Sequence, residues 1–397
     1  MIKVFLKKGR EESLMRFHPW VFSGAIAEIK GSPSEGDVVA VYASDGSFMA
    51  FGHYQIGTIA IRILSYEEDV LMPDFWERRI RAAYLMREKV GLVGNPETDC
   101  YRLVHGEGDL LPGLVVDYYG GVCVLQAHSA GMFRARLRIA EALRKVYGDS
   151  LLAVYDKSSA TVPFKAGLEP VDGYLYIRDG FSDKGFSVLE NGHKFYVNWK
   201  EGQKTGFFLD QRENRALVGR YASGKNVLNL FCYTGGFSIY ALAAGAEKVV
   251  SVDSSRRAVS SLGDNISLNG FNDGKHISVC ADAMDYLKKI PENEYDLIVV
   301  DPPAFAKHRG ALRNALRAYQ RLNADAISKV ASGGLVFTFS CSQAVSREAF
   351  ALAVFSAAAE TGRAVRILDR MNQPSDHAVN IYHPEGEYLK GLLLYVE

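Results

Sequence analysis

The segment 225–254, KNVLNLFCYTGGFSIYALAAGAEKVVSVDS, constrains the fold more than any other part of the chain. The short apolar run 227–231 contains β-formers and is typical of a strand buried on both faces. A helix-forming stretch and a second apolar strand follow, and Asp253 closes that second strand 18 residues after Gly235. This strand–loop–helix–strand order, with an acidic residue at that distance from the glycine, predicts a nucleotide-binding βαβ unit.

The loop of this unit narrows the class of ligand. Its sequence FCYTGGF, 231–237, lacks the G-x-G-x-x-G spacing that seats a dinucleotide pyrophosphate on a helix N-terminus. A ligand with a ribose but no phosphate fits better, and S-adenosylmethionine is the common ligand of that kind. The spacing disfavours a nicotinamide oxidoreductase, and an ordinary glycine turn is the alternative for the loop taken alone.

Composition excludes several classes of protein. The 397 residues suffice for two or three domains. Lys+Arg and Asp+Glu both total 46, so the net charge disfavours bulk electrostatic binding to nucleic acid. A local basic patch is still compatible with this balance. The five cysteines form no C-x-x-C pair, which predicts reduced thiols in a cytoplasmic protein and no metal site. The N-terminus is not a signal peptide, and no apolar stretch approaches the roughly 18 residues that span a membrane.

The chain is predicted to have three parts. Residues 1–70 contain strand-like runs such as 38–42, 48–52 and 59–63, which indicate a small β-barrel. Residues 71–185 alternate strands and helices, with helices expected at 73–90 and 132–146. Residues 186–397 begin with a hairpin that turns at Glu190-Asn191-Gly192 and continue into the nucleotide-binding unit.

Polar side chains follow successive strands after the nucleotide-binding unit. Asp282, Asp301 and Cys341 each come directly after an apolar run, and the elements are predicted in the order β-α-β-α-β-β-α-β. Because ligands bind at the carboxyl ends of the strands in an open α/β sheet, we expect these residues to form one nucleoside pocket with Gly235 and Asp253. For any single acidic residue, the alternative is a helix N-cap.

The motif DPPAF, 301–305, adds chemistry to this edge. Two prolines fix the backbone and remove two N–H donors, which leaves the carboxylate of Asp301 and main-chain carbonyls as acceptors. Such acceptors suit an exocyclic base amine or a protonated ring nitrogen, and Phe305 is suited to stack on a base. A rigid structural loop is the alternative for this motif.

FCYTGGF, the acidic strand ends, DPPAF and FSCS resemble the class I S-adenosylmethionine-dependent RNA methyltransferases. More narrowly, nearly the whole chain resembles the bacterial enzymes that methylate C5 of a cytosine in large-subunit (23S) ribosomal RNA. HPWVF and the strands after it resemble the N-terminal PUA domain of that family, TGFFLDQR resembles the segment that folds over the cofactor, and DHAVNIYHPEGEYLKG also resembles the family.

The resemblance implies an α/β fold with a Rossmann-like methyltransferase sheet, preceded by a PUA-like RNA-binding barrel and a middle α/β domain. It implies ribosomal RNA as the partner, with a homodimer left open. The cofactor-binding residues that it implies are Phe207, Asp210, Gln211, Arg212, Phe231, Tyr233, Gly235, Asp253, Ser254, Asp282 and Asp301. Among these, Phe231, Tyr233 and Gly235 would hold the methionine part, Asp253 the ribose and Asp282 the adenine.

Cys341 decides which reaction is expected. Cytosine C5 is a poor nucleophile, and addition of a thiolate to C6 makes C5 enamine-like. Cys341 in FSCS is the predicted nucleophile, with Asp301 as its catalytic partner. A packed, inert thiol is the alternative for Cys341, and it is what we expect of Cys123 and Cys280. Related cysteine methyltransferases carry a second cysteine in the DPP-equivalent motif, and this chain does not, so the base for the C5 proton is left open between Cys232 and water.

Arginines recur at every fourth position after DPPAF, at 309, 313, 317 and 321, which places them in a slowly drifting stripe on one helix face. Such a stripe suits RNA phosphates, and a solvated, salt-bridged face is the alternative. The residues expected to contact RNA are Pro302, Phe305, Lys307, Arg309, Arg313 and Arg317. Two other functions stay open: an amine methyltransferase acting on adenine or guanine, which does not need Cys341, and a non-catalytic RNA-binding or assembly protein.

Overall fold

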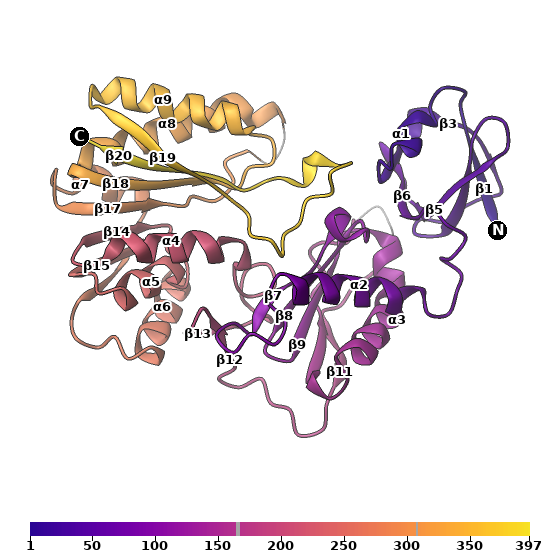
Figure 1. Cartoon of the computed structure of the whole chain (residues 1–397), viewed down its shortest axis with the longest axis horizontal. Helices are drawn as coiled ribbons and strands as arrows, with labels where there is room; N and C mark the ends of the chain where they lie inside the picture. Colours follow the sequence, from indigo (N-terminus) through magenta and orange to yellow (C-terminus); the bar gives the residue numbers. More distant parts are fainter. Residues whose placement is uncertain (164–166, 307–308) are drawn as a thin grey trace. The chain divides into compact units, whose positions relative to one another are not determined.

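The computed structural model of the chain describes residues 1–163, 167–306 and 309–397, apart from the side chain of residue 309. The chain forms two compact units (Figure 1). The first unit consists of Met1–Leu189, Val197–Leu209 and Ser375–Gly386. The second unit consists of Glu190–Tyr196, Asp210–Pro374 and Glu387–Glu397.

The first unit begins with a six-stranded sheet in the order β2-β6-β5-β4-β1-β3. Its strands are β1 (Ile2–Leu6), β2 (Trp20–Phe22), β3 (Ile26–Lys30), β4 (Val38–Tyr42), β5 (Phe48–Tyr54) and β6 (Ile59–Ser65). The three strands predicted between 38 and 63 are confirmed, and apolar side chains including Val4, Val39 and Ile61 fill the interior. The region also contains a short helix, α1 (Glu12–Met15), and a 3-10 turn, η1 (Ser23–Ala25), so it is not all-β. The single buried residue of α1, Leu14, anchors it to the core of this sheet.

The remainder of the first unit is a five-stranded sheet with two helices. Its order is β11-β10-β9-β8-β7, and helices α2 and α3 pack against one another and share its apolar core. The bounds are α2 (Phe75–Lys89), β7 (Cys100–His105), η2 (Gly106–Asp109), β8 (Leu114–Tyr119), β9 (Val122–Ala127), α3 (Ala130–Tyr147), η3 (Gly148–Ser150), β10 (Ala153–Asp156) and β11 (Gly173–Ile177). Helix α3 begins two residues before its predicted start because Ser129 caps it, accepting a hydrogen bond from the Met132 amide at 3.3 Å.

The predicted hairpin at 186–200 is confirmed as β12 (Ser187–Glu190) and β13 (His193–Tyr196). Asn191 and Gly192 occupy its turn with φ of +49° and +79°. Two successive positive φ values are what a two-residue β-hairpin turn requires, and Asn-Gly meets that requirement with little strain.

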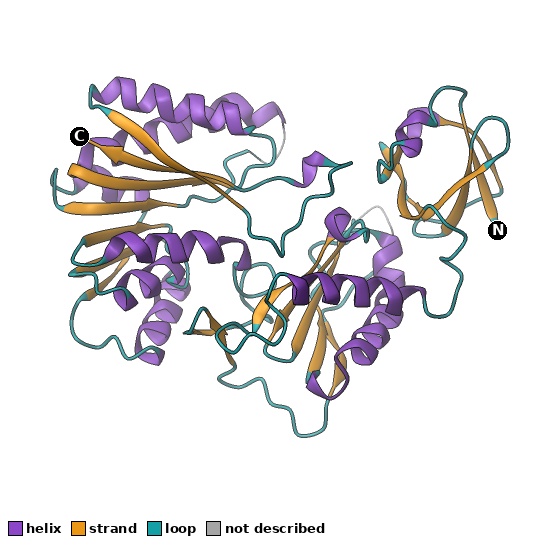
Figure 2. Ribbon diagram, in the orientation of Figure 1, coloured by secondary structure: helices purple, strands orange, loops and turns teal. Residues whose placement is uncertain are grey.

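The second unit is built on a seven-stranded sheet in the order β16-β15-β14-β17-β18-β20-β19. Neighbours from β16 to β18 are parallel, whereas β20 is antiparallel to both β18 and β19. Helices α4, α5 and α6 cover one face and α7, α8 and α9 the other (Figures 1 and 2). The strands are β14 (Asn226–Leu230), β15 (Lys248–Asp253), β16 (His276–Cys280), β17 (Tyr295–Val300), β18 (Val330–Ser340), β19 (Val365–Asn372) and β20 (Lys390–Val396). The helices are α4 (Arg212–Ala222), α5 (Gly236–Ala243), α6 (Arg256–Leu268), α7 (Ala283–Lys289), α8 (Leu312–Lys329) and α9 (Arg347–Thr361).

The predicted order of elements in this unit was wrong at one connection. Helix α7 lies between β16 and β17, where two consecutive strands were expected. Its seven residues bury only Ala283 and Leu287, so its sequence lacks the apolar periodicity that marks a longer helix. Over the described part of the chain, no helix has the length and apolar character needed to cross a membrane.

Candidate cofactor and active site

The candidate site lies where the strand order of the second unit reverses. Strand β14 pairs with β15 on one side and with β17 on the other, and all three are parallel. The carboxyl ends of these strands are the edge at which open α/β sheets bind ligands. The FCYTGGF loop follows β14, Asp253 ends β15, Asp282 follows β16, Asp301 follows β17 and Cys341 follows β18.

The FCYTGGF loop has a strained backbone. Phe231 and Tyr233 have φ of +58° and +48°, a left-handed conformation that costs a residue with a side chain roughly 1–2 kcal/mol. The Asp253 carboxylate stabilises the loop, since its Oδ2 accepts a hydrogen bond from the Tyr233 amide at 2.9 Å and its Oδ1 one from the Ser255 amide at 2.8 Å. Gly235 is required because a Cβ at this position would lie 2.0 Å from Cδ1 of Leu262. Strain of this kind is characteristic of functional sites.

A buried ion pair supports the start of helix α5. Arg215 Nε and Nη2 each donate to the Glu190 carboxylate at 2.7 Å, and the two side chains are 3% and 0% exposed. The Tyr240 hydroxyl donates to the same carboxylate at 3.0 Å. A Cβ at Gly236 would lie 2.8 Å from Cδ of Arg215. The second glycine of the loop therefore lets the Arg215 side chain pack against the backbone at the start of α5. The prediction missed this pair, because nothing local marks two residues 25 positions apart as partners.

Asp301 lies in an environment that favours its protonated form. Its pKa is raised to about 7, chiefly by burial and then by the negative charge of Asp210, while a hydrogen bond from Gln211 and the charge of Arg215 oppose the shift. Asp210 accepts a hydrogen bond from the Tyr388 hydroxyl at 2.6 Å through Oδ2. Its Oδ1 is buried and accepts no hydrogen bond from the described residues. The segment containing Asp210 and Gln211 therefore lies beside the DPP motif.

Cys341 lies on the same side of the sheet, beyond the neighbouring strand. Its Sγ is 3.9 Å from the main-chain carbonyl of Pro302. The pKa of the thiol is raised to about 12, chiefly by burial and then by the charges of Asp301 and Asp210, whereas Lys390 opposes the shift. Lys390 is 5% exposed and its Nζ donates to the carbonyls of Ser342 at 2.7 Å and Val345 at 2.6 Å. The thiol is therefore protonated in the ligand-free protein, with a buried cation beside it.

A family model described as S-adenosylmethionine-dependent methyltransferase matches residues 175–387, more than half of the chain. This chain belongs to the S-adenosylmethionine-dependent methyltransferases. A PUA-like domain model matches residues 4–66, which cover the six-stranded sheet.

Full-length relatives of this methyltransferase support the assignment. Ribosomal RNA large subunit methyltransferase I of Aeromonas hydrophila is 39% identical over 98% of each chain, and that of Shewanella frigidimarina is 40% identical over 99% of this chain and 98% of its own. A putative methyltransferase from Streptococcus mutans has a TM-score of 0.83 at 25% identity over the whole of both chains. A putative methyltransferase complexed with SAH has a TM-score of 0.85 at the same identity and coverage.

The residues of the methyltransferase site fit S-adenosylmethionine. Among the described residues, the Tyr233 and Ser255 amides each donate to one carboxylate oxygen of Asp253, and each of these oxygens has a second lone pair with which it can accept from a ribose hydroxyl. Asp282 caps helix α7 by accepting a hydrogen bond from the Asp285 amide at 3.0 Å, and this cap uses only Oδ1. Ser254 and Asp282 are both exposed at this edge. The enzyme uses S-adenosylmethionine as its cofactor, and the roles of the individual residues stay predictions.

Other predicted cofactor residues are buried. Arg212 is 1% exposed on helix α4. Phe207 is 4% exposed and belongs to the first unit, where its carbonyl accepts a hydrogen bond from the Tyr119 hydroxyl at 3.3 Å. Phe207 therefore belongs to a different unit from the other predicted cofactor residues.

The cysteines differ in their environments. All five are free thiols, as expected. Cys123 is fully buried as a packed residue, but Cys280 is exposed, so the expectation of a packed thiol there was wrong. Cys232 is 5% exposed, and burial together with the charge of Asp253 raises its pKa far above the ordinary value. A protonated, buried thiol is poorly suited to accept the C5 proton.

The predicted RNA-contacting residues fall into three groups. Arg313 and Arg317 are exposed on α8, and neither forms an ion pair with a described residue, so the salt-bridged alternative is not observed for them. Pro302 is buried, and Phe305 is half-buried with its ring centroid 4.8 Å from that of Tyr319. Lys307 and the side chain of Arg309 lie outside the described part of the structure.

Proposed function

We propose that this methyltransferase transfers a methyl group to C5 of a cytosine in large-subunit ribosomal RNA, with Cys341 as the nucleophile at C6. The observation that carries the proposal is that Asp301 and Cys341 directly follow the neighbouring parallel strands β17 and β18. The contact between the Cys341 thiol and the Pro302 carbonyl supports a shared pocket for thiol and carboxyl. The names of the curated relatives support ribosomal RNA as the substrate.

The protein residues supply the activation that cytosine requires. The Cys341 sulfur forms a bond to C6 as the thiol proton is lost and N3 of the cytosine gains one. Asp301 accepts from N4 and stabilises this proton at N3, which its raised pKa favours. Bound S-adenosylmethionine supplies the methyl group. Loss of the C5 proton then breaks the C6–sulfur bond and returns the Cys341 thiolate. Because Cys232 is buried and its pKa is raised, we assign water, and not Cys232, as the base that accepts the C5 proton.

Lys390 supports the nucleophile in this proposal. The thiolate forms next to two carboxyl groups that disfavour it, and Lys390 provides the compensating positive charge. Its two hydrogen bonds to the carbonyls of Ser342 and Val345 fix the turn that presents Cys341. Lys390 is thus a positioning residue in the mechanism, since it acts through Cys341.

Two basic surfaces support RNA as the substrate. Arg313 and Arg317 present guanidinium groups along α8, which follows the DPP motif. In the PUA-like region, a hollow of about 490 Å³ is lined by residues that include Arg10, Phe22 and Arg16, the last of which is 3.9 Å from the carboxylate of Glu12 in the same lining. Guanidinium groups beside an aromatic ring suit single-stranded RNA, because they contact phosphates while a base stacks on the ring.

An exocyclic-amine methyltransferase is the second candidate. The observation that favours it is the raised pKa of Cys341, because a protonated thiol is a weak nucleophile and amine methylation needs none. The acceptors of the DPP motif would serve that reaction unchanged.

Tritium release separates the two candidates. Ribosomal RNA from cells that lack the gene, labelled with tritium at cytosine C5, is incubated with the protein and S-adenosylmethionine. We expect tritium to appear in water in step with methyl incorporation, because methylation at C5 displaces that hydrogen. Methyl incorporation without tritium release contradicts C5 chemistry and supports the amine. Mass spectrometry of nucleosides from ribosomal RNA with and without the gene identifies the product.

A further inference from the structure

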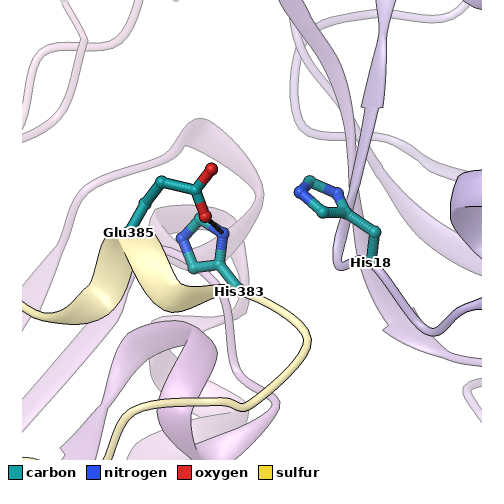
Figure 3. A group of neighbouring side chains, drawn as sticks. All are labelled: His18, His383 and Glu385. Carbon is teal, nitrogen blue, oxygen red and sulfur yellow. Dashed lines mark ion pairs between the residues drawn. The ribbon is translucent and has the colours of Figure 1, made fainter.

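Three side chains of the first unit converge outside the methyltransferase site. The ligand atoms of His18, His383 and Glu385 all lie within 4.8 Å of one another. Figure 3 shows the His18 ring turned toward His383 and Glu385, which come from the segment 375–386 and the turn η7 (Pro384–Gly386). We propose that these three residues bind one divalent transition-metal ion, for which Zn²⁺ is the best match. This inference does not depend on the identity of the methyl acceptor.

The segment that carries His383 is already fixed on the rest of the first unit. Arg87 Nη2 donates to the Asp376 carbonyl at 2.7 Å, and the Arg102 amide donates to the Asp376 carboxylate at 2.9 Å. At Gly108 a Cβ would lie 1.9 Å from the carbonyl oxygen of Ala378, so the two backbones are in close contact. An ion that binds to pre-positioned ligands loses less affinity to ordering them.

His383 is the central ligand. It is 3% exposed, and its ring centroid is 4.2 Å from that of Trp20, so packing holds the imidazole in place. Its Nδ1 lies 3.1 Å from Glu385 Oε2, yet it makes no hydrogen bond with a described residue. A buried nitrogen without a hydrogen bond is unfavourable, and a cation bound by both atoms removes that penalty.

His18 has the support that a metal-binding imidazole requires. Its Nδ1 accepts a hydrogen bond from the Trp20 amide at 3.2 Å and lies at the same distance from the Trp20 carbonyl oxygen. In the tautomer with a proton on Nδ1, this nitrogen gives up the amide and donates to the carbonyl, which leaves the lone pair of Nε2 for the ion, so metal binding selects that tautomer. A histidine that donates from one ring nitrogen to a carbonyl while the other binds the metal is the usual arrangement in metalloproteins.

The charge and chemistry of the cluster match zinc. Arg62 is a nearby cation, but its charge is balanced by Glu107, 2.9 Å away. The Glu107 carboxylate also accepts a hydrogen bond from Trp20 Nε1 at 2.8 Å. The carboxylate of Glu385 therefore leaves the cluster with a net negative charge when both imidazoles are neutral. Two imidazoles and one carboxylate are a common zinc ligand set, and the exposed position of Glu385 gives the ion a route of entry. The bound ion would link the residues before β2 to the segment 375–386.

Zinc binding is tested on the full chain in a Cys280→Ser background, because Cys280 is an exposed thiol that can bind metal by itself. Calorimetric titration with Zn²⁺ is expected to give one site per chain. His383→Phe, which retains a ring against Trp20, should abolish the site, and Glu385→Gln should weaken it at least about tenfold, since a charged ligand becomes neutral. Glu68→Gln, an exposed carboxylate of the same unit, is the matched control and should bind like the parent.

Hydrogen exchange gives a second readout. Saturating Zn²⁺ should slow amide exchange in the segment 375–386 of the parent and have no effect on exchange in His383→Phe. Absence of zinc binding by the parent, or equal binding by His383→Phe, overturns the proposal. If His383→Phe does not fold, Glu385→Gln decides alone, because its side chain is exposed, and parent-like affinity in that variant also overturns the proposal.

Discussion

Lys390 Nζ donates a hydrogen bond of 2.7 Å to the main-chain carbonyl of Ser342, the residue that follows Cys341. Lys390 opens strand β20 and pairs with Ser340 at the end of β18, so the sheet register itself places a buried cation beside the candidate nucleophile. Burial lowers the pKa of Lys390 to about 8, and the neighbouring thiol partly offsets that shift.

Replacement of Lys390 by methionine should make Cys341 less reactive. Without the ammonium group, the two carboxyl groups raise the pKa of the thiol unopposed, and a rise of one unit lowers the thiolate fraction about tenfold. Alkylation of Cys341 by iodoacetamide, followed by peptide mass spectrometry, measures the effect. Lys390→Arg retains the charge and is the matched control; alkylation at the parent rate in Lys390→Met contradicts the assigned role.

Asp301→Asn should change how stability depends on pH. The folded pKa of Asp301, about 7, is raised from the ordinary value of 3.8, so between these values the folded state binds more protons than the unfolded state. The contribution of Asp301 to the free energy of unfolding is therefore fully present at the acidic end of this window and is lost as the pH rises through about 7. The asparagine variant lacks this loss.

Urea unfolding of parent and variant across that pH range measures the difference. Two stability curves that run parallel show that the carboxyl group is not perturbed. The same substitution removes a negative charge beside Cys341 and should therefore speed its alkylation, opposite to Lys390→Met.

Asp253→Ala should weaken binding of S-adenosylmethionine by about 2 kcal/mol, which is roughly thirtyfold in dissociation constant. The side chain supports the loop through Tyr233 and is the predicted partner of the ribose hydroxyls. Calorimetry with Asp264→Ala, an exposed carboxylate on α6, provides the control. Tight binding of NAD by the parent in place of S-adenosylmethionine is the result that the account does not allow.

The double variant Arg313→Glu, Arg317→Glu should weaken RNA binding and flatten its dependence on salt. With fewer contacts to phosphates, binding of the RNA releases fewer counterions. Cofactor affinity should not change. Lys288→Glu with Lys289→Glu introduces the same change in charge on the exposed end of α7 and serves as the control. Equal losses in both double variants indicate a general effect of charge and count against the arginine stripe.

The sequence was informative where function follows from local order along the chain. Buried parallel strands are short apolar runs, and the residue after each run lies at the carboxyl edge, so Asp253, Asp282, Asp301 and Cys341 were found without knowledge of the strand order. The Asn191-Gly192 turn was predictable for the same reason, since two adjacent residues determine it.

Interactions that join distant parts of the chain were not predictable in this way. Lys390 meets the turn after Cys341 only because β20 inserts between β18 and β19, and Arg215 gives no sign that Glu190 is its partner. His18 and His383 are separated by most of the chain, so no spacing rule for metal ligands applies to them. Helix α7 was missed because a seven-residue helix with two buried residues carries too weak a pattern.

The central claim is that Cys341 forms a covalent bond to the target cytosine, and its most direct test is trapping on RNA that contains 5-fluorocytosine. Fluorine cannot leave C5 as a cation, so the methylated adduct cannot release the enzyme. The parent protein with S-adenosylmethionine should form a complex with this RNA that survives denaturing gel electrophoresis, and Cys341→Ala should form none while it still binds the cofactor. The absence of a complex with the parent, together with normal methylation by Cys341→Ala, would contradict the account.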